Sequence, residues 1–570
     1  LYERSLAVKE KAWGKSHPIV ADTINNIGDL YRSQAQYEEA IERFKRALEI
    51  YEAKLGSGHP RVAVALDNIG FSYFGQNQYG EAAKFHKRAL AIREKALGDA
   101  HPDVGTSTVN LANAYFGNNR LDEAIANYEK ALAIFENTLG GAHSRIAIIH
   151  GNLAEVYKVA GKYDEALSSS RRAMSVLTES RSRARAGQLV GGNENAVQLG
   201  NIYSNFAVLA HDAAEQDPSR RAELGEEALQ AGQQYSSTSV TTALAQMAAR
   251  FAADDQSLGK TVRQQQDLKS KWQDLDKALS GELSKPLSAR DPAKTAEIRK
   301  QRRIVEEELE AVAARLNEKF PQYKELTDPK PLKVSAIQRL LGQDEALVTF
   351  VIQDRNSYIW AVTGDRMIWR KLGADTGEKK LSSRVASLRK DLQIETLQQE
   401  GKFFNLQTAY QLYVDLLGPV EDVIKDKKNL LLVPVGSLTS LPFNVLITNE
   451  PPKAVPDKVD GYREAHWLIK RHAVTILPAV SSLRALREFA AAEKAKEPFI
   501  GYGDPDFGGN RGGFARGAKV TSIAAPDLSS VFTREGLVDV DMLTASLPQL
   551  PDTADELRHV AERLGAENER

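Results

Sequence analysis

The sequence contains no cysteine. Disulfides, thiolate metal sites and a cysteine nucleophile are therefore excluded from these 570 residues. No apolar run approaches the roughly 20 residues that cross a bilayer, so we expect no membrane-spanning helix. The 75 basic and 76 acidic residues nearly cancel, which leaves no overall field to attract nucleic acid or an acidic membrane. The length predicts a multidomain protein, since single cores stop growing well below it.

What the sequence does contain is one unit copied four times. Several positions recur at a step of 42 residues: His17, His59, His101 and His143; Gly14, Gly56, Gly98 and Gly140; Tyr31, Tyr73, Tyr115 and Tyr157; Ala40, Ala82, Ala124 and Ala166. Self-similarity at a fixed period of this length is typical of a solenoid. Each unit predicts two amphipathic helices, for example over residues 19–34 and 37–54. One pair cannot bury its apolar face alone, so we expect the units to stack.

These units resemble the tetratricopeptide repeat in the 42-residue form familiar from kinesin light chains. The resemblance covers residues 1–180 and implies an α-solenoid whose first helices line a concave face. A loop and a degenerate fifth copy are expected over residues 181–238, where Asn205-Phe206-Ala207 echoes Asn152-Leu153-Ala154. Because the sequence opens inside a repeat, we expect the chain to be truncated at its N-terminus.

Asparagines recur on the first helix of every pair, at Asn26, Asn68, Asn110 and Asn152. A ladder of carboxamides can bond to both the N–H and the C=O groups of an extended peptide. In the family that the repeats resemble, asparagines at this position contact peptide ligands. We therefore predict that these four residues bind a peptide. The alternative, that each asparagine bonds to the neighbouring repeat, stays open.

The repeat histidines also suggest a metal site, which we reject. Successive copies stack roughly 10 Å apart at ordinary helix spacing, too far to share an ion with bonds of about 2 Å. His-Pro more simply opens a helix, with proline where its missing N–H costs nothing. We expect neither a metal nor a cofactor.

Residues 239–320 predict a helical hairpin. The apolar residues Leu268, Trp272, Leu275 and Leu279 are spaced four, three and four apart, and Val305, Leu309, Val312 and Leu316 repeat that spacing. A turn containing proline separates the two sets, which favours two antiparallel helices with a coiled-coil seam. We interpret the hairpin as a spacer or lever between two domains.

The hydrophobic period changes to two at Leu347. The runs ALVTFVI, SYIWAVT and RMIWRKL predict three strands joined as consecutive hairpins. The run NLLLV ends at Pro434 and predicts a fully buried, parallel strand, and RHAVTIL predicts another strand. Helical segments alternate with these strands, so residues 321–570 are expected to form an α/β domain.

Five motifs of this region resemble the CHAT domain, a caspase-like module often fused to tetratricopeptide repeats in bacteria. In order they are LTDPKPLKVSAIQRLLGQDEALVTFVI, LLLVPVGSLTSLPFNVL, YREAHWLIKRHAVTILPAVSSL, FIGYGDPDF and LPQLPDTADELRHVAERLGA. The resemblance implies a caspase-like fold and a cysteine endopeptidase that cleaves a protein substrate. The family's dyad is a histidine followed by glycine and a cysteine, each at a strand end. Both would lie beyond residue 570, so we expect an incomplete domain.

The residues present do not replace that dyad. Neither His466 nor His472 is followed by glycine, and His472 opens a predicted strand, where a structural role is favoured. Ser437 and Ser440 follow a strand but do not form the G-x-S-x-G elbow of serine hydrolases. We assign no catalytic residue within this sequence.

Two functions remain open. In the first, the repeats bind a protein or peptide partner and regulate a caspase-like cysteine endopeptidase domain. In the second, the chain is a non-catalytic scaffold whose degenerate CHAT domain mediates protein–protein interaction. Neither involves nucleic acid. We expect a cytoplasmic protein, while a signal peptide ahead of Leu1 stays an open alternative.

Overall fold

A computed structural model describes residues 1–139, 141, 143–185, 196–235, 256–283, 291–319, 330–392, 404–456, 459–484 and 487. The chain divides into two compact units, Leu1–Arg487 and Glu488–Arg570, and the described residues all belong to the first. The predicted motifs FIGYGDPDF and LPQLPDTADELRHVAERLGA, the repeat position Gly140 and the turn of the predicted hairpin lie outside the described residues.

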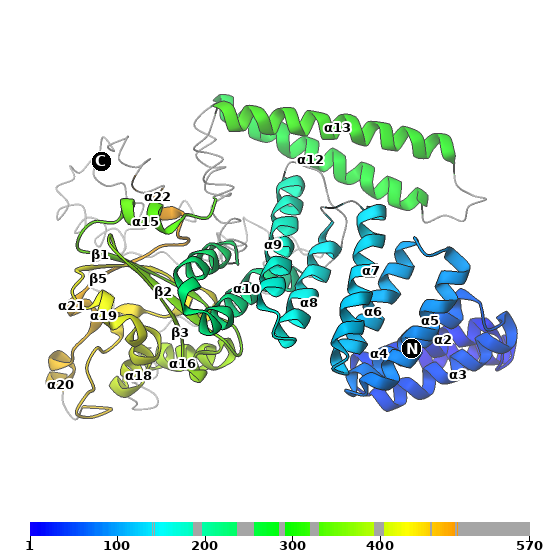
Figure 1. Cartoon of the computed structure of the whole chain (residues 1–570), viewed down its shortest axis with the longest axis horizontal. Helices are drawn as coiled ribbons and strands as arrows, with labels where there is room; N and C mark the ends of the chain where they lie inside the picture. The colour runs from blue at the N-terminus through cyan, green and yellow to red at the C-terminus, as the bar shows by residue number, and fades with distance from the viewer. Residues whose placement is uncertain are drawn as a thin grey trace, which may run out of the picture. The chain divides into compact units, whose positions relative to one another are not determined.

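The repeats form four helical pairs, as predicted (Figure 1). They are preceded by α1 (Tyr2–Trp13) and consist of α2 (Pro18–Ser33) with α3 (Tyr37–Leu55), α4 (Pro60–Gly75) with α5 (Tyr79–Leu97), α6 (Pro102–Gly117) with α7 (Leu121–Leu139), and α8 (Ser144–Val159) with α9 (Tyr163–Arg185). The helices expected at 19–34 and 37–54 agree with α2 and α3 to within a residue at each end. The 42-residue period therefore determined this part of the fold.

Small residues let the two helices of a pair approach closely. A Cβ placed on Gly28 would lie 2.6 Å from the ring of Phe44, and one on Gly70 would lie 2.7 Å from the ring of His86. Both distances are shorter than a real Cβ contact, so a larger residue at either position would force the facing ring to move. Gly56 ends α3 with a φ of 86°, a left-handed conformation that glycine adopts without strain.

A fifth helical pair follows the four repeats. It consists of α10 (Ala196–Gln216), the short helix η1 (Pro218–Arg220) and a helix over residues 221–235. Phe206 and Ala207, which mark the predicted degenerate copy, are fully buried in the same core as the last repeats.

The predicted hairpin is formed by α12 (Gln256–Leu283) and α13 (Pro292–Lys319). The Nε1 of Trp272 donates to Glu306 at 2.9 Å, and Arg302 bonds to Asp276 at 3.0 Å. Residue numbers rise on one helix as they fall on the other, so the two helices are antiparallel. Their apolar core contains predicted seam residues from both helices: Leu268, Trp272, Val305, Leu309, Val312 and Leu316.

Among the described residues of the C-terminal part, five strands form one sheet with the order β3-β2-β1-β4-β5. The strands are β1 (Glu345–Val351), β2 (Tyr358–Val362), β3 (Met367–Lys371), β4 (Asn429–Val433) and β5 (Ala473–Ile476). β1 to β3 form consecutive antiparallel hairpins, whereas β1, β4 and β5 are parallel neighbours. The predicted hairpins and the predicted buried parallel strand at β4 are thus confirmed.

Each face of the sheet is covered by different helices. On one face, Val348, Phe350 and Leu432 pack against α16 (Glu378–Asp391) and α18 (Leu406–Leu416). On the other face, Trp360 and Leu431 belong to the core that contains α10 and the helix at 221–235. Shorter elements complete the region: α15 (Val334–Leu340), η3 (Ala374–Thr376), η4 (Gly418–Val420), α19 (Glu421–Ile424), η5 (Gly436–Ser440), η6 (Phe443–Val445), α20 (Val459–Glu464), α21 (Leu468–Arg471) and α22 (Ser482–Arg484).

Candidate functional site

The four repeat histidines cap the first helices. In each of α2, α4, α6 and α8, the Nδ1 atom of the preceding histidine accepts a hydrogen bond from the main-chain N–H two residues later, at 3.1 to 3.3 Å: His17 from Ile19, His59 from Arg61, His101 from Asp103 and His143 from Arg145. The predicted role of these histidines in opening the helix is confirmed. Within the described residues, no group of three or more potential ligands could hold a metal ion.

The caps set the starting point of each first helix and so place the asparagine series at the same helical position in every repeat. Asn26 on α2 is exposed, whereas Asn68 on α4, Asn110 on α6 and Asn152 on α8 are half-buried. α2 and α4 are in contact, as first helices of successive repeats must be to form a continuous face. The four residues remain predicted peptide-binding residues.

Two of the four asparagines already bond to the neighbouring repeat. The Nδ2 of Asn68 donates to Oδ1 of Asn25 at 3.1 Å, and the Nδ2 of Asn152 donates to Oδ1 of Asn113 at 3.5 Å. The interaction kept open as the alternative therefore exists at these two positions. It engages the amide nitrogen of each side chain and orients its oxygen, and an oriented side chain is what a peptide site requires.

Exposed apolar side chains flank the series on α4, a feature that the repeat analysis missed. Val64 and Phe71 lie four residues before and three residues after Asn68, on the same helical face. Their exposed fractions are 46% and 37%. Val64 also borders a hollow of about 300 Å³, which is lined by Pro60, Val64, Ile92, Arg93, Ala96, Leu97, Asp103 and Thr106.

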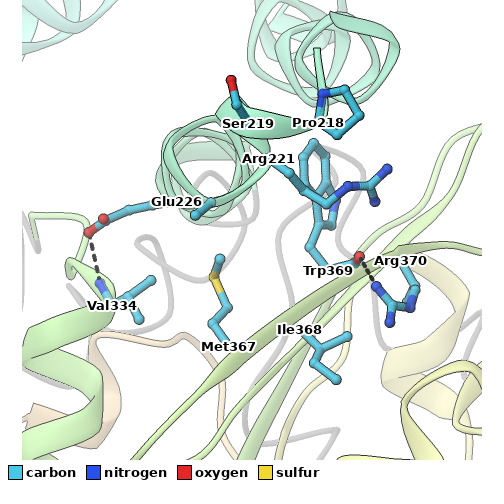
Figure 2. A pocket seen from close by; sticks show the side chains of 10 residues that line it. Pro218, Ser219, Arg221, Glu226, Val334, Met367, Ile368, Trp369 and Arg370 are labelled. Carbon is cyan, nitrogen blue, oxygen red and sulfur yellow. Dashed lines mark hydrogen bonds between the residues drawn. The ribbon is translucent and has the colours of Figure 1, made fainter. Parts of the chain in front are cut away.

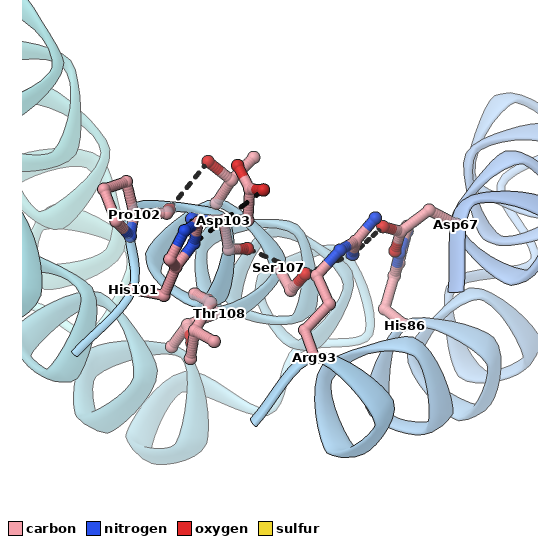
Figure 3. A network of polar contacts seen from close by, with 10 residues as sticks. Asp67, His86, Arg93, His101, Pro102, Asp103, Ser107 and Thr108 are labelled. Carbon is pink, nitrogen blue, oxygen red and sulfur yellow. Dashed lines mark hydrogen bonds and ion pairs between the residues drawn. The ribbon is translucent and has the colours of Figure 1, made fainter. Parts of the chain in front are cut away.

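A buried polar network joins the second and third repeats (Figure 3). The Nδ1 of His86 lies 2.8 Å from Oδ1 of Asp67, and Arg93 bonds to Asp67 and to the hydroxyl of Ser107. His86 is 1% exposed. The network is an anomaly within the repeats, since the positions equivalent to His86 hold Phe44 and Tyr128 and those equivalent to Arg93 hold Tyr51 and Phe135. Aligning the repeats at their 42-residue step would have revealed it.

Ser437 and His472 are not brought together. Ser437 follows the carboxyl end of β4, and its N–H donates to Glu378 at 3.0 Å. His472 precedes the amino end of β5, which is parallel to β4. The two residues therefore lie at opposite ends of neighbouring strands, at least about 13 Å apart for four residues of strand. They cannot form a nucleophile and base pair.

His472 has the structural role that was predicted for it. Its ring is 1% exposed, and its Nδ1–H donates to the carbonyl of Lys427 at 2.5 Å. Burial lowers the pKa of His472. The bond links the start of β5 to the turn before β4.

The comparisons with known proteins match both halves of this architecture. The tetratricopeptide repeat family model matches residues 1–53, 20–95, 61–137 and 103–179, and the CHAT domain model matches residues 406–570. The chain joins tetratricopeptide repeats to a CHAT domain. The fold class predicted from sequence, a repeat solenoid, a helical hairpin and a C-terminal α/β region, is confirmed. The strands β1 to β3 of this TPR–CHAT chain precede the matched range yet belong to the same sheet as β4.

Two similar solved structures each cover less than half of this chain. A putative kinesin light chain from Podosopora anserina with nearly identical TPR-like repeats is 24% identical, covering 37% of this chain and 94% of that one with a TM-score of 0.31. BtubC (BKLC) from P. vanneervenii is 20% identical, covering 40% of this chain and 89% of that one with a TM-score of 0.32. At these TM-scores the likenesses carry no functional argument. No curated protein matches the chain.

In the described ranges, no helix is both long and apolar enough to span a bilayer.

Proposed function

We propose that this TPR–CHAT chain is a partner-binding regulator. Its first helices bind an extended segment of a protein partner, and the binding acts on a caspase-like cysteine endopeptidase domain. The observation that carries the proposal is one hydrophobic core that runs without interruption from Ala112 in the third repeat, through the fifth helical pair, to Val433 in β4. The third and fourth repeats, which carry Asn110 and Asn152, therefore share one packed core with the sheet, so that a change at one end has a physical route to the other.

Polar contacts along this core reinforce the route. Lys158 of α8 forms an ion pair with Asp212 of α10 at 3.1 Å, which ties the fourth repeat to the fifth pair. Arg171 of α9 makes two bonds to Glu227, at 2.9 and 3.1 Å. Bidentate pairs of this kind fix the relative orientation of the elements they join.

The fifth pair is in turn bonded to the sheet and to the segment before it. Gln353, which follows β1, donates to the hydroxyl of Ser204 at 2.6 Å. Gln233 donates to the carbonyl of Leu332 at 2.9 Å and accepts from its N–H at 2.8 Å. The direct contacts between repeats and sheet thus run through the fifth pair, in addition to the chain connection through α12 and α13.

The catalytic half of the proposal depends on residues outside the given sequence. A thiolate is needed for cysteine peptidase chemistry, and residues 1–570 contain no cysteine. Protein of this sequence alone is expected to bind and not to cleave. The family's histidine and cysteine would be supplied C-terminal to Arg570.

The same absence favours a second candidate, a non-catalytic scaffold with a degenerate CHAT domain. The two candidates are separated by translating the gene beyond the codon for Arg570. A His-Gly pair followed by a cysteine supports the peptidase, and a reading frame without them supports the scaffold.

The binding half is tested by panning a phage-displayed random dodecapeptide library on the purified chain. Enriched peptides are then titrated by fluorescence anisotropy against Asn26→Ala and Asn110→Ala, with Asn137→Ala on the exposed surface of α7 as the matched control. Loss of one amide contact is expected to weaken binding roughly three- to tenfold. Equal peptide affinities for all three variants would show that the asparagine series does not bind the peptide.

The regulatory half is tested on the same complexes by hydrogen exchange. Peptide binding is expected to slow exchange of the main-chain amides of β1 and β2, because the core couples them to the groove. If peptides bind through the asparagines and the exchange of β1 and β2 does not change, the proposed regulation is wrong. The non-catalytic scaffold is then the candidate that agrees with the result.

A further inference from the structure

β3 forms one edge of the described sheet and pairs only with β2. The N–H of Thr363 donates to the carbonyl of Arg366 at 2.9 Å, and the N–H of Leu372 donates to the carbonyl of Ser357 at 2.8 Å. Hydrogen-bonded and non-hydrogen-bonded positions alternate along an antiparallel pair. The N–H and C=O groups of the odd-numbered residues Met367, Trp369 and Lys371 therefore point away from β2, toward the outer edge.

This outer edge borders a hollow of about 500 Å³ between the strand and the start of the helix at 221–235 (Figure 2). Met367, Trp369 and Arg370 line it from the strand, and Pro218 of η1 and Arg221 of the facing helix line it from the other side. The hollow leaves room beside the strand for side chains of an added segment. An extended peptide that pairs with an exposed edge in this way is a recurring mode of recognition.

Trp369, which lines the hollow, has unused hydrogen-bonding capacity. Trp369 is 3% exposed, and its Nε1–H has no hydrogen-bond partner among the described residues. A buried indole N–H normally finds an acceptor. Arg370 is exposed and bonds, at 3.4 Å, only to the outward carbonyl of Trp369 within the described part of the chain, where it has no ion pair. Two basic side chains, Arg370 and Lys371, thus follow one another on the edge.

Basic residues on an edge strand are also a common defence against aggregation. That defence does not account for the adjoining hollow or for the unpaired indole of Trp369. Donors and positive charge together favour a segment rich in carbonyl and carboxylate oxygens.

We propose that the outer edge of β3 binds an extended, acidic segment of a protein partner as an added strand. The backbone of the segment pairs with Met367, Trp369 and Lys371, and a carboxylate pairs with Arg370. This surface is separate from the asparagine series, so the proposal stands independently of peptide binding by the repeats.

The test uses a fluorescein-labelled heptapeptide that alternates valine and aspartate, titrated against the full chain by anisotropy. Lys371→Pro removes an outward N–H without removing a bond to β2, and edge positions of this kind tolerate proline. Lys371→Ala is the matched control, since it removes the same charge and keeps the amide. We expect Lys371→Pro to bind about fivefold more weakly than Lys371→Ala, as one hydrogen bond is lost.

Two further comparisons complete the experiment. Methylating the backbone nitrogens of alternate peptide residues is expected to abolish binding in one of the two registers only, since a strand offers one set of amides to its neighbour. Arg370→Glu is expected to weaken binding and to reverse the preference toward a peptide that alternates valine and lysine. Unchanged melting temperatures show that the variants are folded.

Failure of the heptapeptide to bind overturns the proposal, as does equal binding to Lys371→Pro and Lys371→Ala. Equal loss with either methylation pattern indicates contact through side chains and also overturns it. None of these outcomes depends on Asn26 or Asn110, so the two surfaces are tested separately.

Discussion

The Nε1 of Trp360 in β2 donates a hydrogen bond of 3.0 Å to the main-chain carbonyl of Gly225 in the helix at 221–235. Trp369 of β3 stacks on Trp360, with ring centroids 5.7 Å apart. A helix carbonyl comes this close to a sheet only where no side chain intervenes. Gly225 and Gly232 are seven residues apart and so share a helical face. Both lie where this helix contacts the sheet, Gly225 beside Trp369 and Gly232 beside Val351.

Gly232→Ala is expected to destabilise the protein. The added Cβ would lie 2.8 Å from Cγ2 of Val351, which is 1% exposed and cannot move aside. Overpacking of this kind costs about 1–3 kcal/mol, against a gain of up to about 1 kcal/mol in helix propensity. Urea unfolding followed by tryptophan fluorescence measures the difference.

The matched control is Gly151→Ala in α8, where the nearest atom to a new Cβ lies 3.8 Å away. Here the propensity gain is unopposed, so this variant is expected to be as stable as the wild type or slightly more stable. Equal stability of the two alanine variants would show that the helix at 221–235 does not pack on the sheet as described.

Removing one member of the polar network around Asp67 is expected to destabilise the protein strongly. Replacing the whole network by residues from other repeats is expected to change the stability little. Asp67→Ala leaves Arg93 and His86 without the carboxylate that both contact, and loss of one partner of a buried ion pair costs about 3–5 kcal/mol. Because Arg93 retains 16% exposure, we expect a value at or below the lower end of that range. Thermal and urea unfolding provide the measurement.

The replacement carries residues from equivalent positions of other repeats: Asp67→Asn as in Asn25, His86→Phe as in Phe44 and Arg93→Phe as in Phe135. Apolar substitutes for a buried ion pair are often neutral or stabilising. The triple variant is therefore expected to be more stable than Asp67→Ala and close to the wild type. A triple variant as unstable as Asp67→Ala would show that the network is required for packing of the second and third repeats.

His150 is expected to make stability depend on pH. Burial, with a smaller contribution from Arg172, lowers the pKa of His150 from 6.5 to about 4. The unfolded chain then binds more protons than the folded one between these values. The stabilising contribution is complete above pH 6.5 and is lost as the pH falls toward 4. Allowing for partial exposure, the loss at pH 5 is about 1 kcal/mol.

The variant for this prediction is His150→Leu, since Leu66 occupies the equivalent position of the second repeat. Urea unfolding is compared between pH 7 and pH 5, where the variant is expected to lose about 1 kcal/mol less than the wild type. The carboxylates of the protein contribute equally to the loss of stability between pH 7 and pH 5 in the variant and in the wild type. Equal losses of unfolding free energy in the variant and the wild type would contradict the burial of His150.

The candidate site was only partly predictable from sequence. The period of 42 residues placed Asn26, Asn68, Asn110 and Asn152 on equivalent helical positions, because a repeat imposes the same local geometry on each copy. It could not show that Asn68 and Asn152 bond to Asn25 and Asn113, which are not at one repeat position, and those bonds depend on how neighbouring helices pack. Val64 and Phe71 were likewise indistinguishable from core residues until their exposure was known.

The sequence by itself determined the local elements: four helical pairs from their period, the hairpin of α12 and α13 from its apolar seam, and the strands β1 to β4 from alternating or continuous apolar runs. These signals lie within a few residues of chain and follow from backbone geometry. Only the tertiary structure decided that the helix at 221–235 lies on β2, that His86 and Arg93 share Asp67, and that β3 is an edge. Such contacts join residues far apart in the sequence, and their strength comes from close packing that no local pattern records.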